Sequence, residues 1–139
     1  MGFRFLEHTA DIKFQARGKT FEEALENSAE ATFHSICEGI KIEPVVKKEI
    51  AVSGKTKENL VHDFLEELLF FVDTESLLLS KIDGLSVKSD NEILKLSCTA
   101  YFDNAKKYDV SGDIKSVTYS ELLVQEESHE TLIQVVLDI

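Results

Sequence analysis

The chain has 139 residues, 43% of them hydrophobic, which is enough to bury the core of one domain spanning residues 1–139. Its 26 acidic residues against 15 lysines and arginines give a net charge of −11, which repels phosphate backbones and disfavours tight, direct nucleic-acid binding. There is no paired cysteine motif, no apolar run of the roughly 18 residues that a membrane span needs, and no signal-peptide pattern, so we expect a cytoplasmic protein.

The first half of the chain predicts two strands and two helices. Apolar and polar residues alternate over 12–16, which indicates a strand that Gly18 closes. A capping box at Thr20 and apolar residues at spacings of three and four predict a helix from Phe21 to about residue 37. After a poorer strand over 46–52, residues 60–72 have the strongest helical period of the chain. We expect this helix to cover the buried face of a sheet rather than to line a ligand groove.

From residue 77 onward the hydrophobic period is two, which is typical of strands. The predicted strands cover 77–82, 85–87, 94–102, 113–119, 122–125 and 132–139, and Asp83-Gly84 is predicted to be a hairpin turn between the first two. This order of elements predicts an α+β fold, with two helices packed on one face of a largely antiparallel mixed sheet.

Two aspartates stand where a strand is usually apolar. Asp138 shares a face of the last strand with Leu132 and Val136, so we expect it to be withdrawn from water with that face. If Asp11 lies beside Asp138, and the α-carboxylate of Ile139 joins them, a bound cation would neutralise the three charges. Oxygen ligands favour Ca²⁺ or Mg²⁺. The alternative is that each aspartate caps a turn or pairs with a lysine.

Other motifs are absent or ambiguous. No glycine-rich phosphate loop, calcium loop or serine nucleophile elbow is present. Lys115 and Tyr119 share one face of the predicted strand over 113–119. They could form an amphipathic contact surface, or the lysine could simply extend beside an exposed ring.

Five segments, taken together and in order, resemble the archease family over essentially the whole chain. They are residues 5–11, 18–24, 64–69, 114–119 and 137–139. The resemblance implies a protein that is not itself an enzyme. It implies a protein cofactor of the GTP-dependent RNA ligase of tRNA splicing, which promotes guanylylation of the ligase histidine and multiple turnover.

The resemblance also implies site residues. The ligase-activating residues would be Asp11, Lys115 and Asp138. The metal ligands would be Asp11, Asp138 and Ile139, holding Ca²⁺ or, alternatively, Mg²⁺ or Mn²⁺. Three further residues could shape the site, namely His8, Thr9 and Thr118.

The chain departs from the family pattern at two positions. Phe64 replaces a common Trp, which is a tolerable change in a core. Ser120 replaces a His, which puts any role of an imidazole there in doubt. Two other functions stay open on the sequence alone: a small metal-dependent phosphohydrolase that uses the same acids, and a calcium-stabilised protein interaction module.

Overall fold

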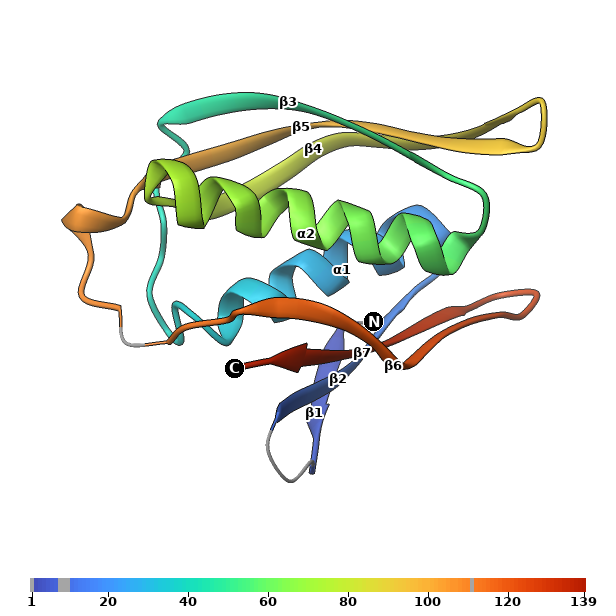
Figure 1. Cartoon of the computed structure of the whole chain (residues 1–139), viewed down its shortest axis with the longest axis horizontal. Coiled ribbons are helices and arrows are strands. Elements are labelled where there is room, and N and C mark those ends of the chain that lie inside the picture. Colours follow the sequence, from blue (N-terminus) through green and yellow to red (C-terminus); the bar gives the residue numbers. More distant parts are fainter. Residues whose placement is uncertain (1, 8–10, 111) are drawn as a thin grey trace.

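The computed structural model describes residues 2–7, 11–110 and 112–139, whose helices and strands form three layers (Figure 1). A four-stranded sheet has the order β1-β2-β7-β6, and a three-stranded sheet has the order β3-β5-β4. Helices α1 (Phe21–His34) and α2 (Lys57–Glu75) lie between the two sheets. The strand pairs described are antiparallel. The predicted α+β class is confirmed, and the strands divide between two sheets, each of which packs against the helices.

The last strand of the chain lies in the middle of the four-stranded sheet. The strands of this sheet are β1 (Phe3–Leu6), β2 (Asp11–Gly18), β7 (Thr131–Asp138) and β6 (Ser116–Glu126). Ile133, Val135 and Leu137 of β7 are fully buried in the hydrophobic core, as are Phe14 and Ala16 of β2. The alternation predicted for these strands therefore gives one face of the sheet that is covered by the helices and one that faces outward.

The three-stranded sheet corrects one predicted turn. Its strands are β3 (Val46–Gly54), β4 (Leu77–Asp90) and β5 (Ile93–Asn104). The prediction that the chain reverses at Asp83-Gly84 is wrong, because β4 continues through these residues with a register shift before Ser86. Gly84 has a φ of 63°, which fits a bulge as well as a turn. The reversal lies at Asn91-Glu92, where φ is 51° and 67°, as a two-residue hairpin loop requires.

Local caps and a wide apolar stripe position the two helices. The hydroxyl of Thr20 accepts the N–H of Glu23 at 3.1 Å, and Thr56 accepts that of Asn59 at 3.0 Å, so each helix has a satisfied N-terminus. In α2, five apolar side chains are fully buried: Leu60, Val61, Phe64, Leu65 and Leu68. This helix contacts β6 on one side and β3 on the other, which explains why its apolar surface is so broad.

A buried carboxylate organises the loop that follows β5. Asp103 is only 2% exposed, and it accepts hydrogen bonds from Lys107 at 2.8 Å and from the Tyr108 hydroxyl at 2.6 Å. These two bonds hold the pKa of the Asp103 carboxyl below its usual range. The Tyr108 oxygen in turn accepts the backbone N–H of Glu43 at 3.0 Å. Asp103 and Tyr108 thereby link the short helix η1 (Ala105–Lys107) to the segment that leads into β3.

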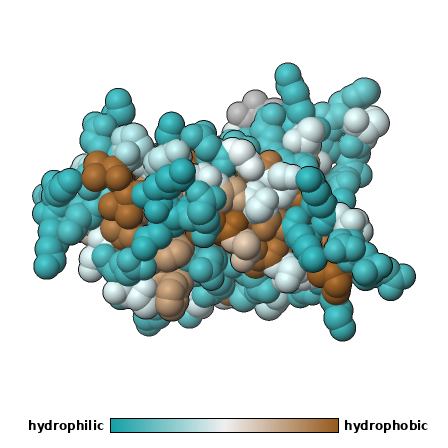
Figure 2. Space-filling view, turned by 90° about the horizontal axis from the view of Figure 1, so that it is seen from above, coloured by the Kyte–Doolittle hydropathy of each residue, from teal (hydrophilic) through white to brown (hydrophobic). Residues whose placement is uncertain are grey.

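The two cysteines, Cys37 and Cys98, are buried free thiols. Burial raises the pKa of Cys37 to about 11 and that of Cys98 to about 12. The view from above the three-stranded sheet shows a mainly hydrophilic surface with scattered apolar patches (Figure 2). Within the described ranges, no helix combines the length and the apolar character that crossing a membrane would take.

Candidate functional site

Asp11 and Asp138 lie directly opposite each other at one end of the four-stranded sheet. Their Cα atoms are register partners in the antiparallel pair β2–β7, and Asp138 is also the partner of Ser116 on β6. Residues directly opposite in such a pair point to the same face, with Cβ atoms about 4.5–5.5 Å apart. The two carboxylates, which are 127 positions apart in sequence (138 minus 11), are therefore neighbours on one face. We call Asp11, Asp138, Lys115 and Ile139 the acidic tip.

The hydrophobic residues of the same strands fix this pairing. Ile12 is opposite Leu137, and Phe14 is opposite Val135. Phe14, Val135 and Leu137 are fully buried against the helices, so a slip by one residue would turn them outward. Burial of the core face thus holds the two aspartates in register.

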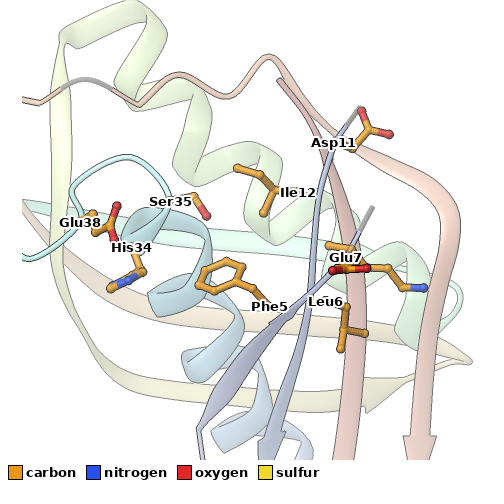
Figure 3. A pocket seen from close by; sticks show the side chains of 9 residues that line it. Phe5, Leu6, Glu7, Asp11, Ile12, His34, Ser35 and Glu38 are labelled. Carbon is orange, nitrogen blue, oxygen red and sulfur yellow. The ribbon is translucent and has the colours of Figure 1, made fainter. Parts of the chain in front are cut away.

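Asp138 is only partly withdrawn from water, although alternation along its strand predicted that it would be buried with its face. Asp138 is half-buried on the outward face of the sheet, as is Asp11. Val136, on the same outward face, is fully buried because Lys13 and Thr118 flank it from the neighbouring strands. Asp138 is at the end of its strand, where less of its surface is covered. In Figure 3 the side chain of Asp11 points away from Phe5 and His34, which lie on the helix side of the hairpin.

Lys115 and Ile139 adjoin the two aspartates through the backbone. The N–H of Lys115 donates to the carbonyl oxygen of Asp138 at 2.8 Å, and Lys115 is exposed. Ile139 follows Asp138 directly and is 46% exposed. The structure thus brings four of the predicted site residues to one end of the sheet.

The remaining predicted residues have different positions. The hydroxyl of Thr118 donates to the carbonyl of Val136 at 3.1 Å, so it joins β6 to β7 beside the acidic tip. Ser120 is exposed within β6, where pairing with β7 is irregular between Thr118 and Leu123. His8 and Thr9 lie outside the described residues.

The atoms of the acidic tip that could bind a cation are all oxygen atoms, from Asp11, Asp138 and the end of the chain at Ile139. Among the residues described, no three His, Cys, Asp or Glu side chains gather in a way that could hold a metal ion. A cation at the tip would therefore need the α-carboxylate of Ile139, or atoms of another molecule, beside the two aspartates. Asp11 also takes part in an interaction within the protein.

The sequence did not predict the link between α2 and the strand next to the acidic tip. Oε1 of Glu66 accepts the N–H of Val117 at 2.5 Å, although helical spacing assigns Glu66 to the wet side of α2. One turn earlier, the ring of His62 stacks on that of Tyr119, with centroids 4.2 Å apart and planes 10° from parallel. Both contacts hold the start of β6 against the helix.

A hollow of about 810 Å³ lies beside the β1–β2 hairpin (Figure 3). Phe5 lines it and is 42% exposed, and its ring stacks on His34 with centroids 5.8 Å apart. Glu7 and Asp11, which flank residues 8–10 in the sequence, also line it. Because those three residues are not described, we assign no ligand to this hollow.

Comparison with known proteins identifies the family. The model of the Archease protein family matches residues 3–139, which is nearly the whole chain. The chain belongs to the archease family. The protein archease of Sulfurisphaera tokodaii is 33% identical over 99% of this chain and 98% of its own length. That of Methanosarcina barkeri is 34% identical over 99% and 95%, respectively.

Solved structures agree with the archease assignment. The solution structure of protein 1598 of Methanobacterium thermoautotrophicum matches with a TM-score of 0.86 and 29% identity, over 99% of both chains. The crystal structure of an archease from Thermotoga maritima, described as a possible chaperone, matches with a TM-score of 0.63. Its 22% identity, over 96% of this chain and 94% of that one, supports the shared fold alone. The sequence-based assignment to the archease family is confirmed.

Proposed function

We propose that this archease-family protein is a cofactor of the GTP-dependent RNA ligase that joins tRNA halves. It would promote guanylylation of the ligase's active-site histidine and so allow multiple turnover. Family membership over residues 3–139 supports this proposal. The observation that carries it is the direct register pairing of Asp11 with Asp138, because it creates a concentrated negative charge at one end of a rigid sheet.

The donors at the acidic tip fit a hard divalent cation. Asp11 and Asp138 lie on the same face, and the α-carboxylate of Ile139 would be a third oxygen ligand. We propose Ca²⁺, with Mg²⁺ or Mn²⁺ as alternatives, because purely oxygen donors select these ions. Such an ion would supply positive charge close to nucleotide phosphates.

The residues of the tip have separate roles in this proposal. The half-buried aspartates are held by strand pairing, so they are preorganised to meet the nucleotide pocket of the ligase. Exposed Lys115, whose backbone is bonded to Asp138, would contact a phosphate or a carboxylate of the partner. The net charge of −11 would speed the approach to a basic RNA-binding protein.

The proposal is tested by multiple-turnover ligation of tRNA halves with the ligase, GTP and this protein. Asp11→Ala, Asp138→Ala and Lys115→Ala should each lower the stimulated rate by more than about tenfold, as loss of a positioned charged group does. Asp83→Ala is the matched control, since Asp83 is an exposed acid on the other sheet that pairs with Lys81. Unchanged turnover with either folded aspartate variant would contradict the proposed mechanism.

A second assay separates the cofactor from the two alternative functions. The purified protein alone is incubated with phosphate esters and a divalent cation, in parallel with the ligase mixture. Hydrolysis by the protein alone that depends on Asp11 and Asp138 would favour a metal-dependent phosphohydrolase. Cation binding without either activity would leave the calcium-stabilised interaction module. Activity in the ligase mixture alone supports the cofactor function.

A further inference from the structure

The outward face of the four-stranded sheet carries both arginines of the chain, Arg4 and Arg17, at one glutamine. Arg4 and Gln15 are register partners on β1 and β2, and Arg17 follows two positions later on the same face of β2. Gln15 Oε1 accepts Nε and Nη2 of Arg4 at 3.2 and 3.0 Å, and Nη2 of Arg17 at 3.5 Å. Two guanidinium groups therefore converge on a single neutral oxygen atom.

Neighbouring amides fix the orientation of Gln15. Its Nε2 donates to Oε1 of Gln134 at 3.0 Å, and Nε2 of Gln134 donates to the backbone carbonyl of Glu121 at 2.9 Å. Because the amide nitrogen of Gln15 is used on one side, its oxygen must face the arginines. The geometry is therefore built by a hydrogen-bond network across three strands.

The positive charge at this point is incompletely neutralised. Arg17 Nε lies 3.6 Å from Glu130, a long and partly exposed pair. Across the described segments of the chain, no carboxylate forms an ion pair with Arg4. A neutral amide cannot offset two like charges, so the site is suited to an external anion.

We propose that Arg4, Gln15 and Arg17 form a binding site for a terminal phosphate group. Two planar guanidinium groups offer more N–H donors than the two oxygens of one carboxylate can accept, whereas a phosphate monoester presents three strong acceptors and nearly two negative charges. The nearly two negative charges of a phosphate would be opposed by the two arginines, of which Arg17 is already partly offset by Glu130. A longer polyanion is disfavoured because the chain as a whole carries a charge of −11.

This site is separate from the acidic tip. Asp11 and Arg17 lie at opposite ends of β2, six positions apart, which corresponds to about 20 Å along a strand. The phosphate site therefore does not rest on the proposed ligase function. Phosphate binding can fail while ligase stimulation persists, and the reverse also holds.

The experiment is a titration of the labelled full chain, followed by NMR signals of the arginine Nε–H and glutamine amide groups. The probes are inorganic phosphate, adenosine 5′-monophosphate and a short glutamate peptide at constant ionic strength. Both phosphates should shift the signals of Arg4, Gln15 and Arg17 saturably in the millimolar range. Equal or stronger shifts with the glutamate peptide would overturn the assignment to phosphate, and no saturable shift with any probe would overturn the site.

Variants make the test specific. Arg4→Ala and Arg17→Ala should each weaken phosphate binding by at least about tenfold, since each removes a charge-assisted contact. Gln15→Glu should weaken phosphate binding by at least about tenfold without unfolding the chain, because the new carboxylate would occupy N–H donors of both arginines and offset one of their two charges. Lys47→Ala, a charge change on the other sheet, is the control and should leave binding unchanged. Undiminished binding by a folded Arg4→Ala, Arg17→Ala double variant would also overturn the proposal.

Discussion

Replacing Asp138 with asparagine should stabilise the cation-free protein. The variant keeps the shape of the side chain and removes one of two like charges that face each other across β2 and β7. At about 5 Å in a water-like dielectric, two unit charges repel by about 0.8 kcal/mol. Like charges at directly opposite strand positions are destabilising on the same scale, about 0.2–1 kcal/mol. We therefore expect Asp138→Asn to raise the free energy of unfolding by about 0.5–1 kcal/mol at low salt.

A divalent cation should reverse the sign of this difference. At a free concentration about 100 times its dissociation constant, a cation that binds only the folded state adds about 2.7 kcal/mol to the free energy of unfolding. The wild-type protein would gain this stability, whereas Asp138→Asn would lack one of the two carboxylates opposite each other and would gain little. In saturating Ca²⁺ the wild type should therefore be the more stable protein by about 2 kcal/mol.

The assay is urea unfolding of both proteins in EDTA and in CaCl₂, each at low salt and at about 1 M NaCl, where the screening length is about 3 Å. Screening should reduce the difference measured in EDTA. Asp83→Asn is the matched control, because Asp83 is an exposed acid paired with Lys81 on the other sheet, and it should respond like the wild type to calcium. A variant less stable than the wild type in EDTA, or equally stabilised by calcium, would refute the idea that the two carboxylates repel and share a cation.

Three further predictions concern buried groups elsewhere in the fold and the link between α2 and β6. Glu66→Ala should leave the N–H of Val117 without its acceptor, which should lower the free energy of unfolding by about 1–3 kcal/mol and speed hydrogen exchange of that amide. Unchanged exchange would show that this hydrogen bond is dispensable. Hydrogen bonds from Lys107 and Tyr108 lower the pKa of Asp103 in the folded state. Ionised Asp103 therefore stabilises the fold above its unfolded-state pKa of about 3.9. This stabilisation is lost as the pH falls through the lower pKa of the folded state. Urea midpoints of wild type and Asp103→Asn should accordingly converge at low pH, and a constant difference would contradict this linkage. Cys37 and Cys98, whose pKa values burial raises to about 11 and 12, should react with a thiol reagent at pH 8 only after unfolding, and rapid reaction of the native protein would contradict their burial.

Local signals predicted the helices because their cause is local. Thr20 caps the backbone a few residues away, and the apolar spacing around Phe64 reports the buried side of one helix. The proximity of Asp11 and Asp138 came from a different kind of argument: it was the condition of the cation hypothesis, and the resemblance to archeases implied it. Their register pairing confirms that they are neighbours.

Alternation within a strand could not predict the division into two sheets, because it shows which residues face a core and not which strand is adjacent. The same limit explains why Asp138 is less buried than predicted. The apolar Val136 suggested a covered face. Val136 is indeed fully buried, but the neighbouring strands cover it, and this cover does not extend fully to Asp138. Gly84 misled for another reason, since a positive φ serves a bulge and a turn alike.

The central place of β7 in its sheet has a consequence for synthesis of the protein. On the ribosome, β1 and β2 are synthesised first. The four-stranded sheet cannot form until residues 131–138 follow, because β7 lies between β2 and β6. Contacts between such distant segments close slowly and raise the contact order of the fold. Until residues 131–138 have been synthesised and have paired with β2, the exposed edge of β2 is open to pairing with other chains, which exposes the nascent protein to aggregation.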